Sequence, residues 1–382
     1  MKKIPITAPS FDEQEVALVR ECLQSGWVTQ GPFVSRFEQL FGARHQTPHA
    51  LATTSCTAAL HLAGLALGFG PGDEVIVPAF TWITSAHTAE YAGAKAVFVD
   101  VDLATFNIDP ARIEAAITPR TRGIVAVHLF GLSADMDPIR AIAKKHGLAI
   151  VEDAACATGT TYKGRPIGTM GDVGCFSLHP RKVITTGEGG MLTTARDDLA
   201  AKLKSLRNHG ATGLPPGADP SRPYTMGAFD MLGFNLRMSD IQAAVGVAQM
   251  ARLDGLLAER KACARRYDEL LARLATAGDL ALPGGAGHTY QSYVVRVLQG
   301  GQARRNRVMD HLAAGGIQTR PGTHAVHRLG YFVAKYGLEA SQFPNACIAE
   351  DTTITLPIFP GMAPDDSERV VREVDFALKQ RA

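Results

Sequence analysis

Short apolar runs alternate with amphipathic stretches through the first half of the chain. The runs at residues 74–78, 96–99, 123–127 and 148–151 have the length of strands, and the segments between them have the length of helices. Strands that are apolar throughout are typical of parallel sheets covered by helices on both faces. The alternation therefore predicts an α/β fold with a mostly parallel sheet.

The charge balance excludes several classes of partner. The chain has 39 Lys and Arg against 37 Asp and Glu, a net charge of +2, so no strong field attracts nucleic acid or an anionic membrane. No apolar stretch reaches the about 20 residues of a membrane span, and the first residues lack a signal-peptide core. The six cysteines show no metal-type spacing. We expect a cytoplasmic enzyme or binding protein without a metal site.

One loop has the composition of a site for covalent catalysis. Residues 175–194 read CFSLHPRKVITTGEGGMLTT, and the single lysine, Lys182, lies between a proline and a glycine-rich turn. A lysine fixed in this way can attack a carbonyl as a Schiff-base amine. Most lysines are solvated, so the loop alone does not separate a catalytic lysine from an exposed one.

Other segments could bind a flat, phosphorylated ligand. Residues 53–57 (TTSCT) precede an apolar helix, and a helix start rich in hydroxyl groups is a typical anion site. Trp82 follows a predicted strand and could stack on a planar ring or pack in the core. Asp153 follows another strand and could lie under such a ring or cap a helix. Trp27, in a glycine-flanked loop, could face a ligand or pack into the hydrophobic core.

These features together resemble the DegT/DnrJ/EryC1/StrS family of enzymes that depend on pyridoxal 5'-phosphate (PLP). The matching segments are WVTQGP (27–32), PGDEVIVPAFTW (71–82), VFVDVD (97–102), EDAA (152–155), FSLHPRKVITTGEGGM (176–191), RNHG (207–210) and GFNLRMSDIQAA (233–244). The resemblance covers nearly the whole chain. It implies the fold type I (aspartate aminotransferase-like) architecture, which we divide into a large PLP-binding domain at 1–250 and a small C-terminal α+β domain at 251–382.

The resemblance also implies roles for individual residues. Lys182 would form the Schiff base with PLP and move the proton at the reacting carbon, and Asp153 would keep the ring nitrogen protonated. The residues expected to contact the cofactor are Cys56, Thr57, Ala58, Trp82, Asp153, Cys156, Ser177, Lys182 and Asn235. The candidate substrate contacts are Trp27, Thr29, His179 and His327.

Two positions need separate comment. Asn235 resembles the asparagine that this family supplies from the neighbouring subunit, which implies a homodimer with shared active sites; Asn208 and Arg237 are alternatives. Cys156 stands where many members have glutamine, and a thiol is a weaker hydrogen-bonding group than an amide. The contact to the cofactor's 3-oxygen is therefore in doubt.

The predicted reaction is transfer of an amino group from L-glutamate, which leaves as 2-oxoglutarate, to the keto group of a nucleotide-linked deoxysugar. A cyclitol ketone or another keto sugar could take the place of the nucleotide sugar. A PLP-dependent sugar dehydratase is disfavoured because that branch of the family has histidine where Lys182 stands. A PLP-binding regulator without turnover is disfavoured because Lys182, Asp153 and the phosphate donors are all present.

Two helices are predicted with defined ends. A helix at residues 10–25 begins with Ser10 as its N-cap and places Val16 and Leu23 on its buried face. A long helix follows Met238 and is expected to bend near Gly255.

Overall fold

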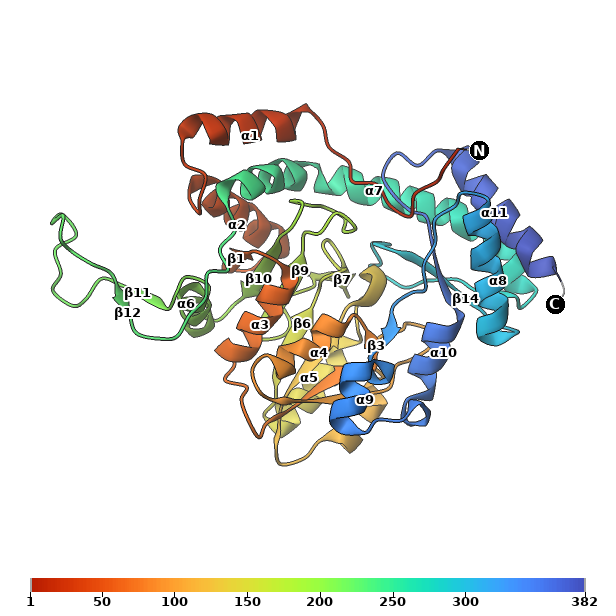
Figure 1. The fold of residues 1–382 in the computed structure, drawn as a ribbon, viewed down its shortest axis with the longest axis horizontal. Helices are drawn as coiled ribbons and strands as arrows, with labels where there is room; N and C mark the ends of the chain where they lie inside the picture. Colours follow the sequence, from red (N-terminus) through yellow and green to blue (C-terminus); the bar gives the residue numbers. More distant parts are fainter. Residues whose placement is uncertain (1, 381–382) are drawn as a thin grey trace.

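The computed structural model describes residues 2–380, and its elements are labelled in Figure 1. The helices are α1 (Glu13–Ser25), α2 (Pro32–His45), α3 (Cys56–Ala66), α4 (Ile83–Glu90), α5 (Met136–His146), α6 (Asp197–Leu206), α7 (Asp240–Thr276), α8 (Gly301–Ala314), α9 (Gly330–Tyr336), α10 (Pro344–Thr352) and α11 (Pro364–Lys379). The strands are β1 (His49–Thr53), β2 (Glu74–Pro78), β3 (Phe80–Thr81), β4 (Lys95–Val99), β5 (Thr121–Val127), β6 (Ala149–Asp153), β7 (Thr161–Tyr162), β8 (Arg165–Pro166), β9 (Val173–Ser177), β10 (Gly190–Thr194), β11 (Ala211–Gly213), β12 (Ala228–Phe229), β13 (Leu280–Ala281), β14 (Tyr293–Val297), β15 (His324–Ala325) and β16 (Thr353–Leu356).

A seven-stranded sheet forms the centre of the fold, in the order β1-β10-β9-β6-β5-β2-β4. The pairs β9–β6, β6–β5, β5–β2 and β2–β4 are parallel. Strand β10 runs antiparallel to both β1 and β9. The predicted mostly parallel α/β sheet is confirmed.

Helices cover both faces of this sheet because its strands are apolar on both sides. Val75 and Val77 of β2 pack on the face that carries α3 and α4. Ile76, between them, packs on the opposite face with α2, α5 and the first half of α7. Alternate residues of a strand point to opposite faces, so a continuous apolar run builds two hydrophobic cores at once.

A third hydrophobic core lies around the smaller sheet β13-β14-β16. The second half of α7, with α8 and α11, packs on it, and Ile4 near the start of the chain joins it through a bridge to Ile317. Residue 250, the predicted domain boundary, lies inside α7, and the division into 1–250 and 251–382 stays a prediction.

No break interrupts α7 near Gly255, because the helix continues over 37 residues, and the predicted bend stays a prediction. A glycine in a helix costs about 1 kcal/mol relative to alanine. The packing of α7 against α1, α2 and α11 is extensive enough to hold Gly255 in helical geometry. Among the described residues, no helix is both long and apolar enough to cross a membrane.

The predicted start of the first helix is wrong. The N-cap is Asp12, which forms a reciprocal capping box with Glu15. Ser10 instead accepts a hydrogen bond of 2.8 Å on its hydroxyl from Arg252 of α7. Val16 and Leu23 are about half exposed, at 49% and 55%, because the face of α1 that packs on α7 carries other residues.

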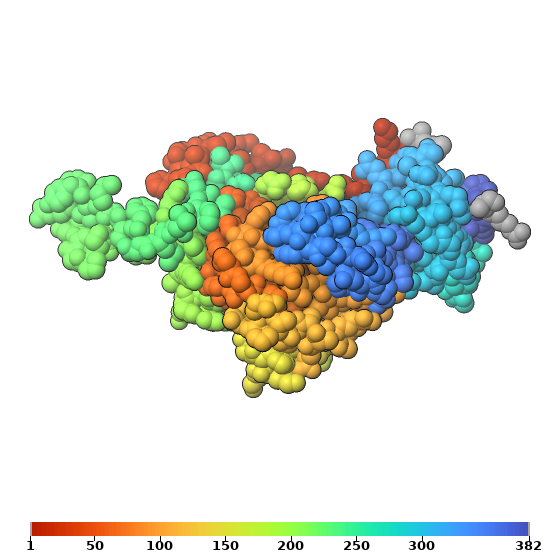
Figure 2. All heavy atoms as spheres, turned by 60° about the horizontal axis from the view of Figure 1, so that its bottom comes forward, coloured from red at the N-terminus to blue at the C-terminus, as the bar shows by residue number. Residues whose placement is uncertain are grey.

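A hairpin arm, residues 211–232, extends away from the rest of the molecule (Figures 1 and 2). It contains the short antiparallel pair β11–β12. Its exposed apolar side chains are Leu214, Tyr224, Met226, Phe229 and Leu232. Such a concentration of exposed apolar residues on one projecting segment is typical of a contact surface.

Candidate active site

A cavity of about 450 Å³ lies at the carboxyl ends of the central parallel strands. Open α/β sheets bind ligands at this edge. Eight of the predicted site residues line it: Cys56, Thr57, Trp82, Asp153, Cys156, Ser177, His179 and Lys182. These residues come from four separate segments of the chain, so the fold gathers them.

Lys182 is held by the turn that joins β9 to β10. Its backbone N–H donates to the His179 carbonyl at 2.8 Å, and the base of the turn is closed by Leu178, whose N–H donates to the Gly189 carbonyl at 2.9 Å. The Lys182 side chain is half-buried, and its Nζ donates to Cys156 Sγ at 3.2 Å. Within the described chain no carboxylate forms an ion pair with this amine, which leaves it available to a carbonyl.

Asp153 ends β6 as a buried carboxylate, 3% exposed. Its Oδ2 accepts from the Ser85 hydroxyl at 2.6 Å, and its Oδ1 accepts from the Ala155 N–H at 3.1 Å. Burial raises the pKa of Asp153, and the hydrogen bonds from Ser85 and Ala155 offset part of that rise. Only neutral groups donate hydrogen bonds to this carboxylate among the described residues. A cation that enters the cavity would therefore stabilise its charged form.

His128 lines the same cavity beside Asp153 and is fully buried. Its Nδ1 accepts from the Ala134 N–H at 3.1 Å, which leaves the proton on Nε2. The Nε2 lies 3.0 Å from Glu152 Oε2 and donates to it. These partners fix the imidazole as a neutral ring packed at the cavity wall.

The start of α3 lies against the start of β10 at the cavity. Ser55 caps the helix by accepting from the Ala58 N–H at 3.1 Å. The preceding N–H groups, on Cys56 and Thr57, have no acceptor within the helix, and both residues line the cavity with Ser177. A Cβ on Gly190 would lie 2.4 Å from Ser55, so only glycine lets the strand approach this closely.

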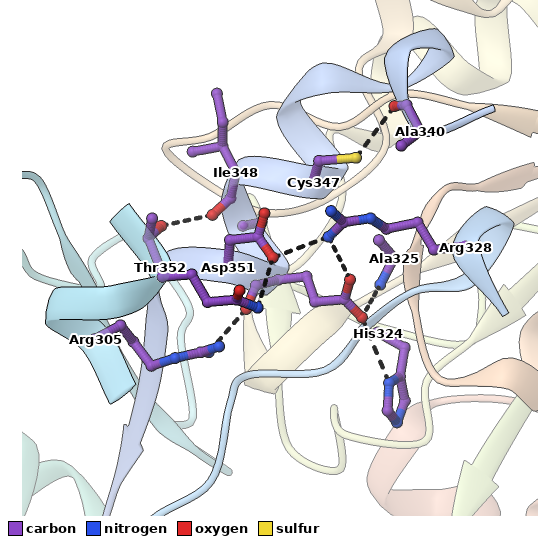
Figure 3. Close-up of polar contacts among 12 residues, drawn as sticks. Arg305, His324, Ala325, Arg328, Ala340, Cys347, Ile348, Asp351 and Thr352 are labelled. Atoms are coloured by element: carbon purple, nitrogen blue, oxygen red, sulfur yellow. Dashed lines mark hydrogen bonds and ion pairs between the residues drawn. The ribbon is translucent and has the colours of Figure 1, made fainter. Parts of the chain in front are cut away.

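Trp82 forms another wall of the cavity and is 51% exposed. Its ring lies 5.6 Å from that of His324, which the β3–β15 pairing brings beside it. Behind His324, Glu350 accepts from the Ala325 N–H at 3.1 Å and pairs with Arg328 at 2.8 Å. Figure 3 shows Arg328 contacting this network from above and His324 from below. The wall is therefore supported by charged contacts on α10.

Five predicted residues lie outside the cavity lining. The Ala58 N–H is used by Ser55. Asn235 bridges Asn208, which also accepts a short hydrogen bond from Arg237. Thr29 lines a second cavity of about 570 Å³ with Asn208 and Arg237.

Trp27 and His327 are also placed elsewhere. The Trp27 Nε1–H donates to the Gln30 carbonyl at 3.1 Å, and its ring is 55% exposed. His327 is fully buried, with its Nε2 at 3.5 Å from Cys347 Sγ. A contact between His327 and a substrate would require this packing to open.

Several residues that line the cavity or support its lining are not marked by the sequence motifs. Ser85 lies one helical turn after Trp82, and its role depends on Asp153, 68 positions away. Gln291 and Arg320 come from the C-terminal third of the chain. The Pro-Gly pair after Arg320 marks a loop, but nothing in the local sequence shows which cavity that loop borders.

The sequence profile of the DegT/DnrJ/EryC1/StrS aminotransferase family matches residues 9–375. The chain belongs to this family. It is 42% identical over 99% of both chains to GDP-perosamine synthase of Caulobacter vibrioides, and 39% identical to spore coat polysaccharide biosynthesis protein SpsC of Bacillus subtilis, over 98% of this chain and 97% of SpsC.

Solved structures agree with this assignment. The putative sugar aminotransferase Spr1654 of Streptococcus pneumoniae, in its PMP form, superposes with a TM-score of 0.92, 29% identity and coverage of 99% of both chains. Its PLP form superposes with a TM-score of 0.91. The family member described here is a PLP-dependent aminotransferase with the fold of these enzymes, as the resemblance predicted.

The residues present fit PLP on chemical grounds. The buried Asp153 carboxylate lacks a cationic partner, the start of α3 offers unpaired N–H groups to a phosphate, and the Lys182 amine is free of carboxylates. PLP carries a ring nitrogen for Asp153, a phosphate for the start of α3 and an aldehyde for the Lys182 amine.

Proposed function

We propose that this aminotransferase moves an amino group from L-glutamate to the keto group of a nucleotide-linked sugar, with a GDP-linked sugar as the first candidate. The observation that carries the proposal is the convergence of Lys182, Asp153 and the start of α3 on one cavity. The 42% identity to GDP-perosamine synthase over nearly the full length supports the GDP-linked sugar.

In this proposal Lys182 has two tasks. Its amine would hold PLP covalently, and once the donor frees it the Nζ would move a proton between the reacting carbon of the substrate and the cofactor in each half-reaction. The Cys156 sulfur, 3.2 Å away, accepts from the amine and holds it at the cavity floor. Bound PLP supplies the electron sink that makes the proton at this carbon acidic.

Asp153, Trp82 and the start of α3 would hold the cofactor. Asp153 would keep a proton on the ring nitrogen, Trp82 would stack on the ring, and the N–H groups of Cys56 and Thr57 with the Ser177 hydroxyl would bind the phosphate. Each contact uses a group that is buried in the wall or lines the cavity.

The active enzyme in this proposal is a homodimer in which Asn235 reaches the phosphate of the other subunit. Asn235 and its partner Asn208 lie outside the cavity of their own chain. The hairpin arm (211–232), with Met226 78% exposed and Leu232 87% exposed, leads directly to Asn235. A second copy of the chain would cover these apolar side chains and receive Asn235 at its own site.

The experiment is a spectroscopic titration of the PLP-loaded enzyme with L-glutamate, run in parallel on Lys182→Ala. We expect the pyridoxal absorbance of the wild type to be replaced by that of pyridoxamine phosphate, with release of 2-oxoglutarate, and no such change in the variant. The amine-loaded wild type should then aminate a GDP-linked keto sugar. Amination of a cyclitol ketone alone would redirect the proposal to that substrate, and identical spectra for the two proteins would refute the role of Lys182.

A further inference from the structure

Two arginines border the active-site cavity without a carboxylate partner. Arg181 adjoins Lys182 in the β9–β10 turn, and Arg320 precedes a Pro-Gly loop near β16. In the described part of the chain, Arg320 donates only to backbone carbonyls, from Nε to Pro321 at 3.3 Å and from Nη2 to Gly322 at 2.9 Å. Arg320 is half-buried and Arg181 is exposed, and a partly buried cation is costly unless a ligand neutralises it.

Arg181 and Arg320 line the same cavity and carry like charges. Burial, followed by the charge of Arg181, lowers the pKa of Arg320, and no carboxylate opposes this effect. Buried arginines elsewhere in the chain have hydrogen-bond acceptors: Arg207 pairs with Glu38 at 2.6 Å, and Arg260 and Arg305 donate to backbone carbonyls. Among the described residues, no acid pairs with Arg181 or Arg320 at the cavity.

Hydrogen bonds to the backbone hold both arginines at the cavity. The Gln291 Nε2 donates to the Arg181 carbonyl at 2.7 Å. The Arg320 carbonyl accepts from the Thr355 N–H of β16 at 2.7 Å. Arg181 lies in the turn between β9 and β10 of the large sheet, whereas Arg320 is tied to β16 of the smaller sheet, so a bound anion would contact both parts.

We propose that Arg181 and Arg320 form an oxyanion subsite that binds the ionised group of a substrate beside Lys182. Guanidinium groups bind carboxylates and phosphates through paired hydrogen bonds. The same chemistry fits a carboxylate of the amino donor and a phosphate of the sugar nucleotide. The identity of these two substrates rests on the function proposed above; the presence of an anion subsite does not.

The test measures binding of two unreactive probes to the PLP-loaded enzyme by calorimetry: maleate for the donor carboxylates and GDP for the nucleotide phosphates. The variants are Arg320→Gln, Arg320→Lys and Arg181→Gln. Arg307→Gln, on the exposed face of α8, is the matched control. Because a hydrogen bond to a charged group contributes about 1.5–3 kcal/mol, both glutamine variants should weaken one probe about tenfold or more.

Arg320→Lys keeps the charge and should recover part of that binding, which a purely structural role would not produce. Weaker maleate binding identifies the donor carboxylate as the ligand, with a higher KM for L-glutamate and a smaller change in kcat. Weaker GDP binding identifies the nucleotide phosphate as the ligand, with a higher KM for the sugar substrate.

The proposal is overturned if both probes bind the glutamine variants within about twofold of the control, or if the wild type binds neither probe. Arg181 is exposed, so Arg181→Gln keeps the test valid if Arg320→Gln fails to fold. A wild type that fails to transfer an amine from glutamate would refute the proposed function. Probe binding needs no turnover, so the affinity of the subsite can still be measured in that case.

Discussion

The Ser85 hydroxyl on α4 donates a hydrogen bond of 2.6 Å to the Asp153 carboxylate at the end of β6. Ser85 in turn lies 2.8 Å from the Thr81 hydroxyl, so a short chain of hydroxyl groups leads to the buried acid. The ionisation of Asp153 is therefore controlled by a neighbour that sequence motifs do not mark.

Asp153→Asn should lower kcat by about 10²–10³, the usual effect of removing one preorganised electrostatic group. The amide cannot balance a positive charge on the cofactor ring. Steady-state rates at saturating donor and acceptor measure this loss, and a kcat within about twofold of wild type would contradict the role of Asp153.

The same substitution should stabilise the cofactor-free protein at pH 7. Burial raises the pKa of Asp153 in the folded state, so its ionised form opposes folding increasingly as the pH rises above the unfolded value of about 3.9. We expect cofactor-free Asp153→Asn to have a higher Tm than cofactor-free wild type at pH 7 and a smaller difference near pH 4. An unchanged or lower Tm at pH 7 would contradict the inference that burial destabilises the ionised Asp153 carboxylate.

Ser85→Ala should move the acid limb of the pH–rate profile upward by about one pH unit. The Ser85 hydrogen bond lowers the pKa of Asp153, and a bond to a charged group that contributes about 1.5 kcal/mol corresponds to about one pKa unit. Ser205→Ala is the control, because Ser205 is a buried serine that donates to the Ala211 carbonyl outside the cavity. Equal profiles for the two variants would show that Ser85 does not act on Asp153.

Iodoacetamide should label Cys156 in the cofactor-free protein and much less in the PLP-loaded protein. Of the six cysteines only Cys156 and Cys347 are partly exposed, and of these two Cys156 lines the cavity. Peptide mass spectrometry measures both sites in one sample, with Cys347 as the internal control. Equal protection of the two cysteines would indicate a general change in the protein rather than a ligand covering Cys156.

Mixing Lys182→Ala with Asn235→Ala chains should restore activity that neither variant has alone. If Asn235 acts in the other subunit, each mixed dimer contains one complete site, and random exchange gives about one quarter of the wild-type activity. The assay follows refolding of the mixed chains from denaturant, with each variant refolded alone as control. Activity no greater than the sum of the two separate variants would place Asn235 in its own subunit.

The sequence was sufficient for the parts of the site that are local. The alternation of strands and helices predicts the parallel sheet, and the loop around Lys182 and the residues at the start of α3 are each short segments whose geometry is set by near neighbours. These local features are the ones that the structure gathers at one cavity.

The remainder depends on contacts between distant segments. His324 stands beside Trp82 only because β15 pairs with β3, and Arg320 reaches the cavity only when β16 is in place. The start of α1 depends on Ser10 being bound by Arg252. Neither the hydrophobic periodicity nor a local motif marks such pairings, because tertiary packing decides them.

The bridge between Ile4 and Ile317 has a consequence for the order of folding. Ile4 is among the first residues to be synthesised, yet its partner is added 313 positions later. At about 5–20 residues per second, Ile4 waits roughly 15–60 s for the segment that buries it. The C-terminal core therefore closes at the end of synthesis, and an N-terminal fusion or a deletion of the first five residues would act on the last part of the protein to fold.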